Sequence, residues 1–278
     1  MINIDVLLKS ANEMEPLPTT AASLVGLTAN DDWSWNQIVD IIKLDPIMAT
    51  RVLRLANSAA YYTRSGPNVN IGTAAMRLGI SNVLAIAIAS GVNTLLKGDI
   101  PELGWGKNQL WRNAIAASLV PETVSVQLSI KVPGEASAAA LLHNIGVLIL
   151  RHYLKSDEVN QLKKIFSETG DIYAAENELF NMDHAEIGGM VLKRWNLPAP
   201  IVESVANHSK PNKSPKPCTD MVYLASKVAM DVVPPELDGR IPSFDSSVFE
   251  RLNFNEERYN SLVAAVTEHL DEIISIYA

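Results

Sequence analysis

Two stretches of the chain are apolar on every side, and they constrain the fold more than any other feature. One covers residues 83–92 and reads VLAIAIASGV, and the other covers 136–150, where the polar pair His143–Asn144 interrupts it. A helix without a polar face is normally the buried centre of a helical bundle. Both runs are shorter than the ~20 residues that a membrane-spanning helix needs. A strand is the alternative for 83–92, but Ser81, a suitable helix cap, favours a helix.

Residues that favour the first cap position of a helix precede apolar periodic runs along the whole chain. The clearest are Ser34, Asp45, Asn70, Ser81 and Asp183. Gln37 and Glu186 each follow a cap at the spacing of a capping box. Gly79 is placed to end the helix that begins after Asn70. Strand patterning is almost absent, so the sequence predicts an all-α protein.

A segment rich in glycine and proline, 98–106, predicts a linker between two packed helical bundles. The N-terminal helical subdomain then covers residues 1–98, and a second subdomain covers 107–278. The second begins with a long helix from Asn108, in which Pro121 is expected to cause a kink or a break.

Composition excludes several classes of protein. Hydrophobic residues make up 47% and charged residues 19%, which rules out a disordered chain. The net charge of −8 argues against a nucleic-acid partner, because an acidic chain repels phosphates unless it has a local basic patch. Cys218 is the only cysteine, so an intrachain disulfide or a multi-cysteine zinc site is impossible. Residues 1–11 lack a basic flank and do not form a secretory signal. We expect a cytoplasmic protein with no membrane partner.

Sequence motifs for phosphate-binding loops, dinucleotide folds, serine hydrolases and zincins are absent. The chain has five histidines, and His143 stands out because it lies within an apolar run, next to Asn144. A buried imidazole needs hydrogen-bond partners, since an unsatisfied polar group costs about 1–3 kcal/mol. Two readings stay open: a satisfied core histidine with a structural amide, or the remnant of a functional site.

Several ordered motifs resemble those of one family. LLHNIGVLIL (141–150) is similar to the signature helix of the HD superfamily of metal-dependent phosphohydrolases. The segments DPIMATRVLRLANSAAYY (45–62), IGTAAMRLG (71–79) and HAEIGGMVLKRWNLP (184–198) resemble the HDOD family, the HD-related output domains. The resemblance covers roughly residues 12–210. It implies an N-terminal helical bundle packed on a degenerate HD-like bundle with a C-terminal helical extension, and a bacterial regulatory role.

The resemblance also implies where a metal site would lie. The first histidine position of catalytic relatives falls on Asn113, and the His-Asp dyad reads His143–Asn144. The later aspartate falls near Ser226, although Asp220 and Asp231 lie on the same helix. His184 and His208 match further histidines of the branch that hydrolyses cyclic dinucleotides. This chain departs from the pattern of that branch at two positions, where Asn207 replaces a histidine and Val147 replaces a lysine. We therefore expect a vestigial cleft with no catalytic residue, formed by Asn113, His143, Asn144, His184, His208 and Ser226.

No cofactor is expected, because the carboxylates that would offset a metal's charge are missing. His143, His184 and His208 could still hold one borderline divalent ion such as zinc or nickel. Otherwise His184 is an exposed residue of a first helical turn. Arg51 and Arg54 are expected on a solvated face. Three lysines (Lys210, Lys213 and Lys216) are expected in a mobile surface loop.

The leading hypothesis is a non-catalytic signal-transduction module that binds a signalling protein or a small ligand. The alternative is a metal-dependent phosphohydrolase of the HD type acting on a nucleotide or cyclic dinucleotide. A nucleic-acid-associated regulator is a third reading, which the acidic charge disfavours.

Overall fold

The computed structural model describes residues 17–28, 32–61, 67, 69–128, 130–151, 154–236 and 244–277. Within these ranges the regular structure is helical, apart from an isolated bridge between Ile100 and Trp105. The predicted all-α class is therefore confirmed. The absence of a secretory signal was predicted from residues 1–11, which lie outside the described residues.

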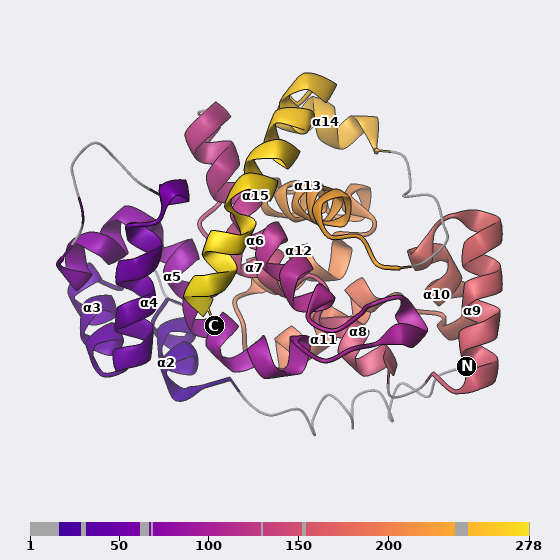
Figure 1. The fold of residues 1–278 in the computed structure, drawn as a ribbon, viewed down its shortest axis with the longest axis horizontal. Coiled ribbons are helices and arrows are strands. Elements are labelled where there is room, and N and C mark those ends of the chain that lie inside the picture. Colours follow the sequence, from indigo (N-terminus) through magenta and orange to yellow (C-terminus); the bar gives the residue numbers. More distant parts are fainter. Residues whose placement is uncertain are drawn as a thin grey trace.

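Helices at the N-terminal end form one bundle, at the left of Figure 1. They are α2 (Thr19–Thr28), α3 (Trp35–Lys43), α4 (Pro46–Ala56) and α5 (Ile71–Leu96). The side chains of Ser34, Asp45 and Asn70 accept backbone N–H groups from the first turns of α3, α4 and α5, as predicted. These caps satisfy donors that the helices themselves leave unpaired.

The long helix α5 contains the first apolar run. Gly79 has a φ of 74° and a ψ of 163°, which are not helical, so two helical segments meet there at a kink, and the prediction that a helix ends at Gly79 is confirmed. Ser81 was expected to cap the second segment. Instead, the Ser81 hydroxyl accepts the backbone N–H of Ser137. By length and composition, 71–93 could cross a membrane. However, α2, α3, α4 and α7 pack against α5, as expected for a core helix. The cytoplasmic location stays a prediction.

Further helices form the larger part of the molecule. They are α6 (Gln109–Leu128), α7 (Ala136–Leu142), α8 (Ile145–Arg151), α9 (Ser156–Thr169), α10 (Ile172–Phe180), α11 (His184–Arg194), α12 (Ala199–Asn207), α13 (Pro217–Val232), α14 (Ser246–Leu252) and α15 (Glu256–Tyr277). Of the kink or break expected at Pro121, the break is wrong, because α6 continues through this residue, packed against α7, α13 and α15. The single helix expected at 136–150 is instead divided at His143–Asn144 into α7 and α8.

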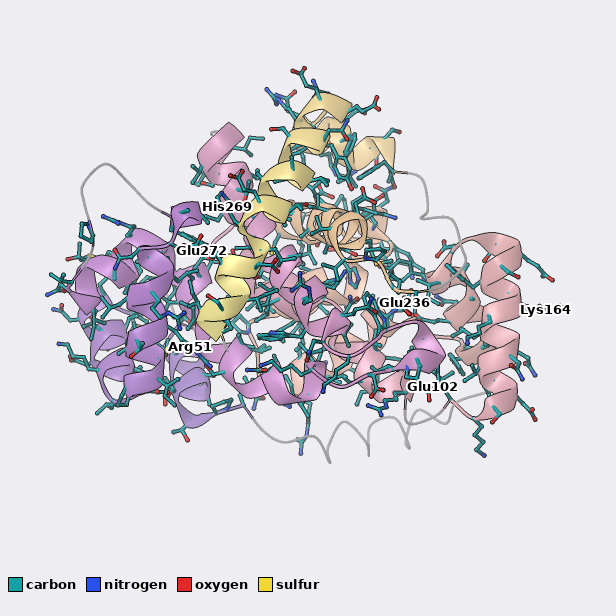
Figure 2. All side chains as sticks on the ribbon, in the orientation of Figure 1. Arg51, Glu102, Lys164, Glu236, His269 and Glu272 are labelled. Carbon is teal, nitrogen blue, oxygen red and sulfur yellow. The ribbon has the colours of Figure 1, made fainter. Side chains whose placement is uncertain are left out.

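The C-terminal helix α15 contacts both parts of the molecule (Figure 1). Arg51 of α4 donates to the carbonyl oxygen of Tyr277, and Arg54 donates to that of Ser275. Glu272 accepts the backbone N–H of Ala59, and Figure 2 shows Arg51 and Glu272 at this junction. The expectation that the two arginines lie on a solvated face is therefore confirmed for Arg54, which is exposed, and wrong for Arg51, which is half-buried. The division at residues 98–107 stays a prediction.

Candidate functional site

Three buried histidines meet where three helix ends converge. His143 follows α7, His184 begins α11, and His208 follows α12. The ring centroids of His143 and His208 are 5.2 Å apart, and those of His184 and His208 are 5.7 Å apart. We call His143, His184 and His208 the three-histidine cluster. All three side chains are buried, so the reading of His184 as an exposed first-turn residue is wrong.

Close contact between two helix backbones brings the cluster together. A Cβ atom on Gly146 of α8 would lie 2.0 Å from the carbonyl oxygen of His184 and 2.7 Å from the backbone nitrogen of Gly188. No larger residue fits there without moving a backbone. Glycine at position 146 therefore allows α11 to approach α8 closely enough for His184 to lie near His143.

Hydrogen bonds fix the orientation of each imidazole. Nδ1 of His143 lies 2.7 Å from the carbonyl oxygen of Ala140, and Nδ1 of His208 lies 2.7 Å from that of Val205. Because a carbonyl oxygen only accepts, both Nδ1 atoms carry the proton, and Nε2 of each neutral ring keeps its lone pair. Nδ1 of His184 donates to the Glu176 carboxylate at 2.8 Å. Nε2 of His143 and of His184 is buried without a hydrogen-bond partner among the described residues.

Burial and mutual repulsion determine the protonation of the cluster. Burial, followed by the nearby His184, lowers the pKa of His208 to about 4. Burial, followed by His208, lowers the pKa of His143 well below its usual value of 6.5. Burial also disfavours charge on His184, but its attraction and hydrogen bond to Glu176 outweigh this and raise its pKa. His184 is therefore the member of the cluster that protonates first.

Glu176 and Tyr173, both on α10, were not predicted as site residues. Glu176 is only 1% exposed and also accepts the backbone N–H of His184. The sequence did contain a signal, because Glu176 occupies an apolar-stripe position between Ile172 and Leu179 in an i, i+4, i+7 pattern. A carboxylate on such a stripe needs a buried partner.

Tyr173 covers one side of the cluster. Its ring stacks on that of His184, with centroids 4.8 Å apart and planes 30° apart. Its hydroxyl lies 3.4 Å from Nε2 of His208 and 3.4 Å from the hydroxyl of Ser226. Ser226 is thus brought to the cluster by α13. The two aspartates of α13 are used elsewhere, since Asp220 pairs with Arg251 and Asp231 accepts the hydroxyl of Tyr259.

The two asparagines of the expected cleft form a buried amide pair. Asn144 donates to the side-chain oxygen of Asn113 at 3.0 Å, and Asn113 donates to the carbonyl oxygen of Val233 at 3.0 Å. Both residues are less than 5% exposed. At the two positions that the sequence resemblance assigns to a metal-binding histidine and aspartate, this chain has a hydrogen bond between neutral amides.

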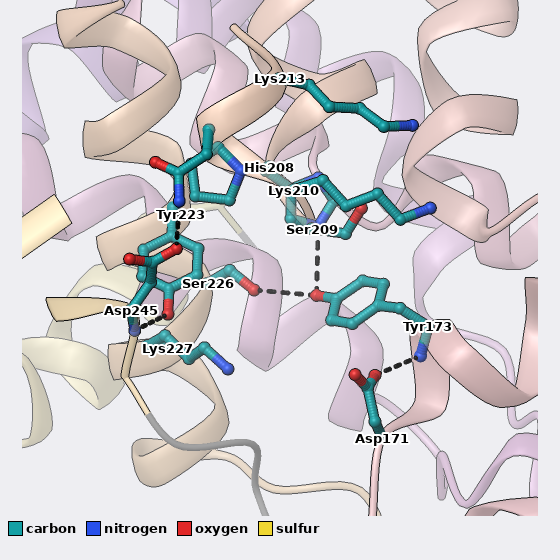
Figure 3. A pocket seen from close by; sticks show the side chains of 12 residues that line it. Asp171, Tyr173, His208, Ser209, Lys210, Lys213, Tyr223, Ser226, Lys227 and Asp245 are labelled. Atoms are coloured by element: carbon teal, nitrogen blue, oxygen red, sulfur yellow. Dashed lines mark hydrogen bonds between the residues drawn. The ribbon is translucent and has the colours of Figure 1, made fainter. Parts of the chain in front are cut away.

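A pocket with a volume of about 660 Å³ opens beside the cluster (Figure 3). Its lining includes residues of α10, of α13 and of the segments that precede α10, α13 and α14; they are Asp171, Tyr173, His208, Ser209, Lys210, Pro211, Asn212, Lys213, Tyr223, Ser226, Lys227 and Asp245. Of the six residues predicted for the cleft, His208 and Ser226 line this pocket. Asn113, His143, Asn144 and His184 do not line it and are buried.

The basic segment at one wall of the pocket is tied to α11. Lys210 lies 2.9 Å from the fully buried carboxylate of Asp183, the N-cap of α11, and Lys213 lies 3.4 Å from Glu186. The hydrogen bond from Lys210 and the backbone N–H of Glu186 overcome the effect of burial and lower the pKa of Asp183 to about 2. Lys216 pairs with Glu203 of α12. The segment lies at the surface, as expected, with Lys213 and Lys216 exposed, and its lysines pair with acidic side chains of α11, of its N-cap and of α12. Its mobility stays a prediction.

The donor set fits one borderline ion better than the pair of hard ions that phosphate hydrolysis would use. Three imidazoles with fixed Nδ1 protons are suitable ligands for zinc or nickel, and Glu176 supports His184 in the way that carboxylates support metal-bound histidines. However, no group of three or more potential ligands among the described residues is arranged to hold an ion. The neutral Asn113–Asn144 pair also supplies no charge to a hard cation.

The sequence model of the HDOD domain matches residues 14–211. The chain belongs to the HDOD family. A curated relative, an uncharacterised protein of Treponema pallidum (strain Nichols), is 24% identical over 239 residues, which are 83% of this HDOD protein and 44% of the relative. This chain thus spans less than half of that relative's length.

Solved structures share the fold. An HDOD protein of unknown function from Geobacter sulfurreducens has a TM-score of 0.70 at 19% identity, with 98% of this chain and 99% of that chain covered. A protein of Marinobacter aquaeolei VT8 with an assumed role in signal transduction has a TM-score of 0.67 at 20% identity (97% and 60% covered). An assumed phosphohydrolase of Shewanella amazonensis SB2B has a TM-score of 0.66 at 23% identity (98% and 98% covered).

Proposed function

We propose that this HDOD protein is a non-catalytic signal-transduction module that binds a small ligand in the pocket beside the three-histidine cluster. The observation that carries the proposal is the hydrogen bond between Asn113 and Asn144. Catalysis on a phosphate ester by metal ions needs anionic ligands to hold hard cations and activate water. Here the amides at these positions bind each other and the carbonyl oxygen of Val233.

The lining of the pocket favours a ligand with an anionic group. Its lining contains the ammonium group of Lys227, together with Lys210 and Lys213, which also pair with Asp183 and Glu186, and hydroxyls of tyrosine and serine add hydrogen-bonding groups. The two lining carboxylates, Asp171 and Asp245, are engaged as N-caps of α10 and α14. A volume of about 660 Å³ is within the range of small-molecule sites.

A route from the pocket to the rest of the protein supports a regulatory role. The hydroxyl of Tyr223, in the pocket wall, accepts the backbone N–H of Asp245 at the start of α14. Tyr259 of α15 donates to Asp231 of α13, and the other end of α15 is held by Arg51 of α4. A ligand that moves the wall can therefore change how α15 sits on the N-terminal bundle, where a signalling protein would bind.

Ligand binding can be tested by thermal unfolding of the full chain with inorganic phosphate, pyrophosphate and a panel of nucleotides, in buffer with a chelator. We expect at least one of these anions to raise Tm, because a ligand of the folded state stabilises it. Lys227→Met should remove that shift, whereas Lys164→Met, at an exposed lysine of α9, should keep it. If no anion in the panel raises Tm, the proposed ligand chemistry is wrong.

A metal-dependent phosphohydrolase is the second candidate. It is favoured by the unpartnered Nε2 atoms of His143 and His184, which a bound cation would use. An ion held there would polarise a phosphate ester and activate water. Stoichiometric divalent metal in purified protein, together with phosphate release that is lost in His143→Ala, would overturn the non-catalytic proposal.

A further inference from the structure

Tyr173 lies where the three-histidine cluster meets the pocket, which His208 also lines. It lines the pocket, and its ring stacks on His184 and meets His208 edge-on, with centroids 5.7 Å apart and planes at 81°. Figure 3 shows its hydroxyl directed towards Ser226 and His208. An aromatic side chain of α10 thus lies between the pocket and His184, beside His208.

The Tyr173 hydroxyl also engages the atom of His208 that a metal would need. Nδ1 of His208 donates to Val205, so Nε2 accepts and the phenol donates to it. The Ser226 hydroxyl can then donate to the phenol oxygen. Both contacts are 3.4 Å long, so they are weak and can be displaced.

We propose that Tyr173 is a plug that closes the three-histidine cluster to borderline divalent ions such as Co²⁺, Zn²⁺ and Ni²⁺. Its hydroxyl occupies the lone pair of His208, and its ring covers the pocket side of His184. With Tyr173 in place, an ion that reaches the pocket meets a His208 Nε2 that is already hydrogen-bonded and a His184 ring that is stacked under the phenol. The inference rests on the proposed function, in which the pocket works without a metal.

The plug can be tested by titrating Co²⁺ into the metal-free full chain and following the visible absorption of cobalt bound by imidazoles. Wild type should bind Co²⁺ weakly. Tyr173→Phe keeps the ring but frees Nε2 of His208, and loss of one weak hydrogen bond corresponds to an affinity about three- to tenfold higher. Tyr173→Ala also opens the wall and should bind more tightly still. Both gains should disappear when His208→Asn is added.

Tyr61→Phe is the matched control, because Tyr61 is a buried tyrosine outside the pocket lining, and its hydroxyl donates to Asn82 of α5. It should bind Co²⁺ as wild type does. If Tyr173→Phe and Tyr173→Ala, both folded by circular dichroism, bind Co²⁺ no more tightly than wild type, Tyr173 is not a plug. The proposed function is tested separately, by the Tm shifts that anions cause in buffer with a chelator. Ligand binding in the pocket and the plug role of Tyr173 can therefore fail independently.

Discussion

Acid should destabilise the fold through His208, and a single substitution can isolate the effect. The unfolded chain takes up a proton at this residue near pH 6.5, whereas the folded chain does so only near pH 4. Between these values the unfolded state binds more protons, so the free energy of unfolding falls as the pH falls. Between pH 8 and pH 5, the two pKa values correspond to a loss of about 2 kcal/mol.

His208→Asn is the suitable perturbation, because its amide can still donate towards the carbonyl oxygen of Val205 but cannot take up a proton. Urea unfolding, followed by fluorescence of the five tryptophans, gives the free energy of unfolding between pH 8 and pH 5, above the range in which most carboxylates titrate. The loss on acidification should be about 2 kcal/mol smaller in the variant than in wild type.

Two other groups must be considered in this comparison. The raised pKa of His184 acts in the opposite direction, because its contribution to stability is present below pH 6.5 and is lost as the pH rises through its folded pKa. It acts in both proteins, so the difference between them reports mainly on His208. His269→Asn, on α15, is the matched replacement outside the cluster. If wild type and His208→Asn lose the same free energy on acidification, the buried neutral state inferred for His208 is wrong.

Three further results are expected. In urea unfolding, Gly146→Ala should lower the free energy of unfolding by about 3 kcal/mol or more, because the new Cβ meets a backbone oxygen. Gly26→Ala, in an exposed turn of α2, should instead raise it by about 0.5–1 kcal/mol. Lys210→Met should cost about 1–3 kcal/mol and raise the pKa of Asp183 from about 2, measured by carboxyl NMR titration. Arg51→Met should speed amide hydrogen exchange in the last turns of α15, and unchanged exchange would contradict its anchoring role.

Local features of the fold could be predicted from the sequence because their causes lie within a few residues. Ser34, Asp45, Asn70 and Asp183 each cap a helix with side chains that reach only two or three residues along the chain. The expected break at Pro121 failed for the opposite reason. The stability of α6 at that point comes from helices packed around it, which local propensity does not report.

Prediction of the candidate site was limited in the same way. The motifs indicated the three histidines, but not the partners that set their protonation, Glu176 and Tyr173. Arg51 finds its partner 226 residues away, and Lys210 finds Asp183 across a helix. A sequence shows the charge of such a side chain, whereas only the folded chain shows which group neutralises it.

The anchoring of α15 at both ends has a mechanical consequence. Its 22 residues form a rod about 33 Å long, at 1.5 Å per residue. Tyr259 holds one end to α13, and Arg51 holds the other to α4. On a rod of that length, a tilt of about 5° at one end becomes a displacement of about 3 Å at the other. A small tilt of α15 at its α13 end would thus reach the N-terminal helices as a displacement of several ångströms.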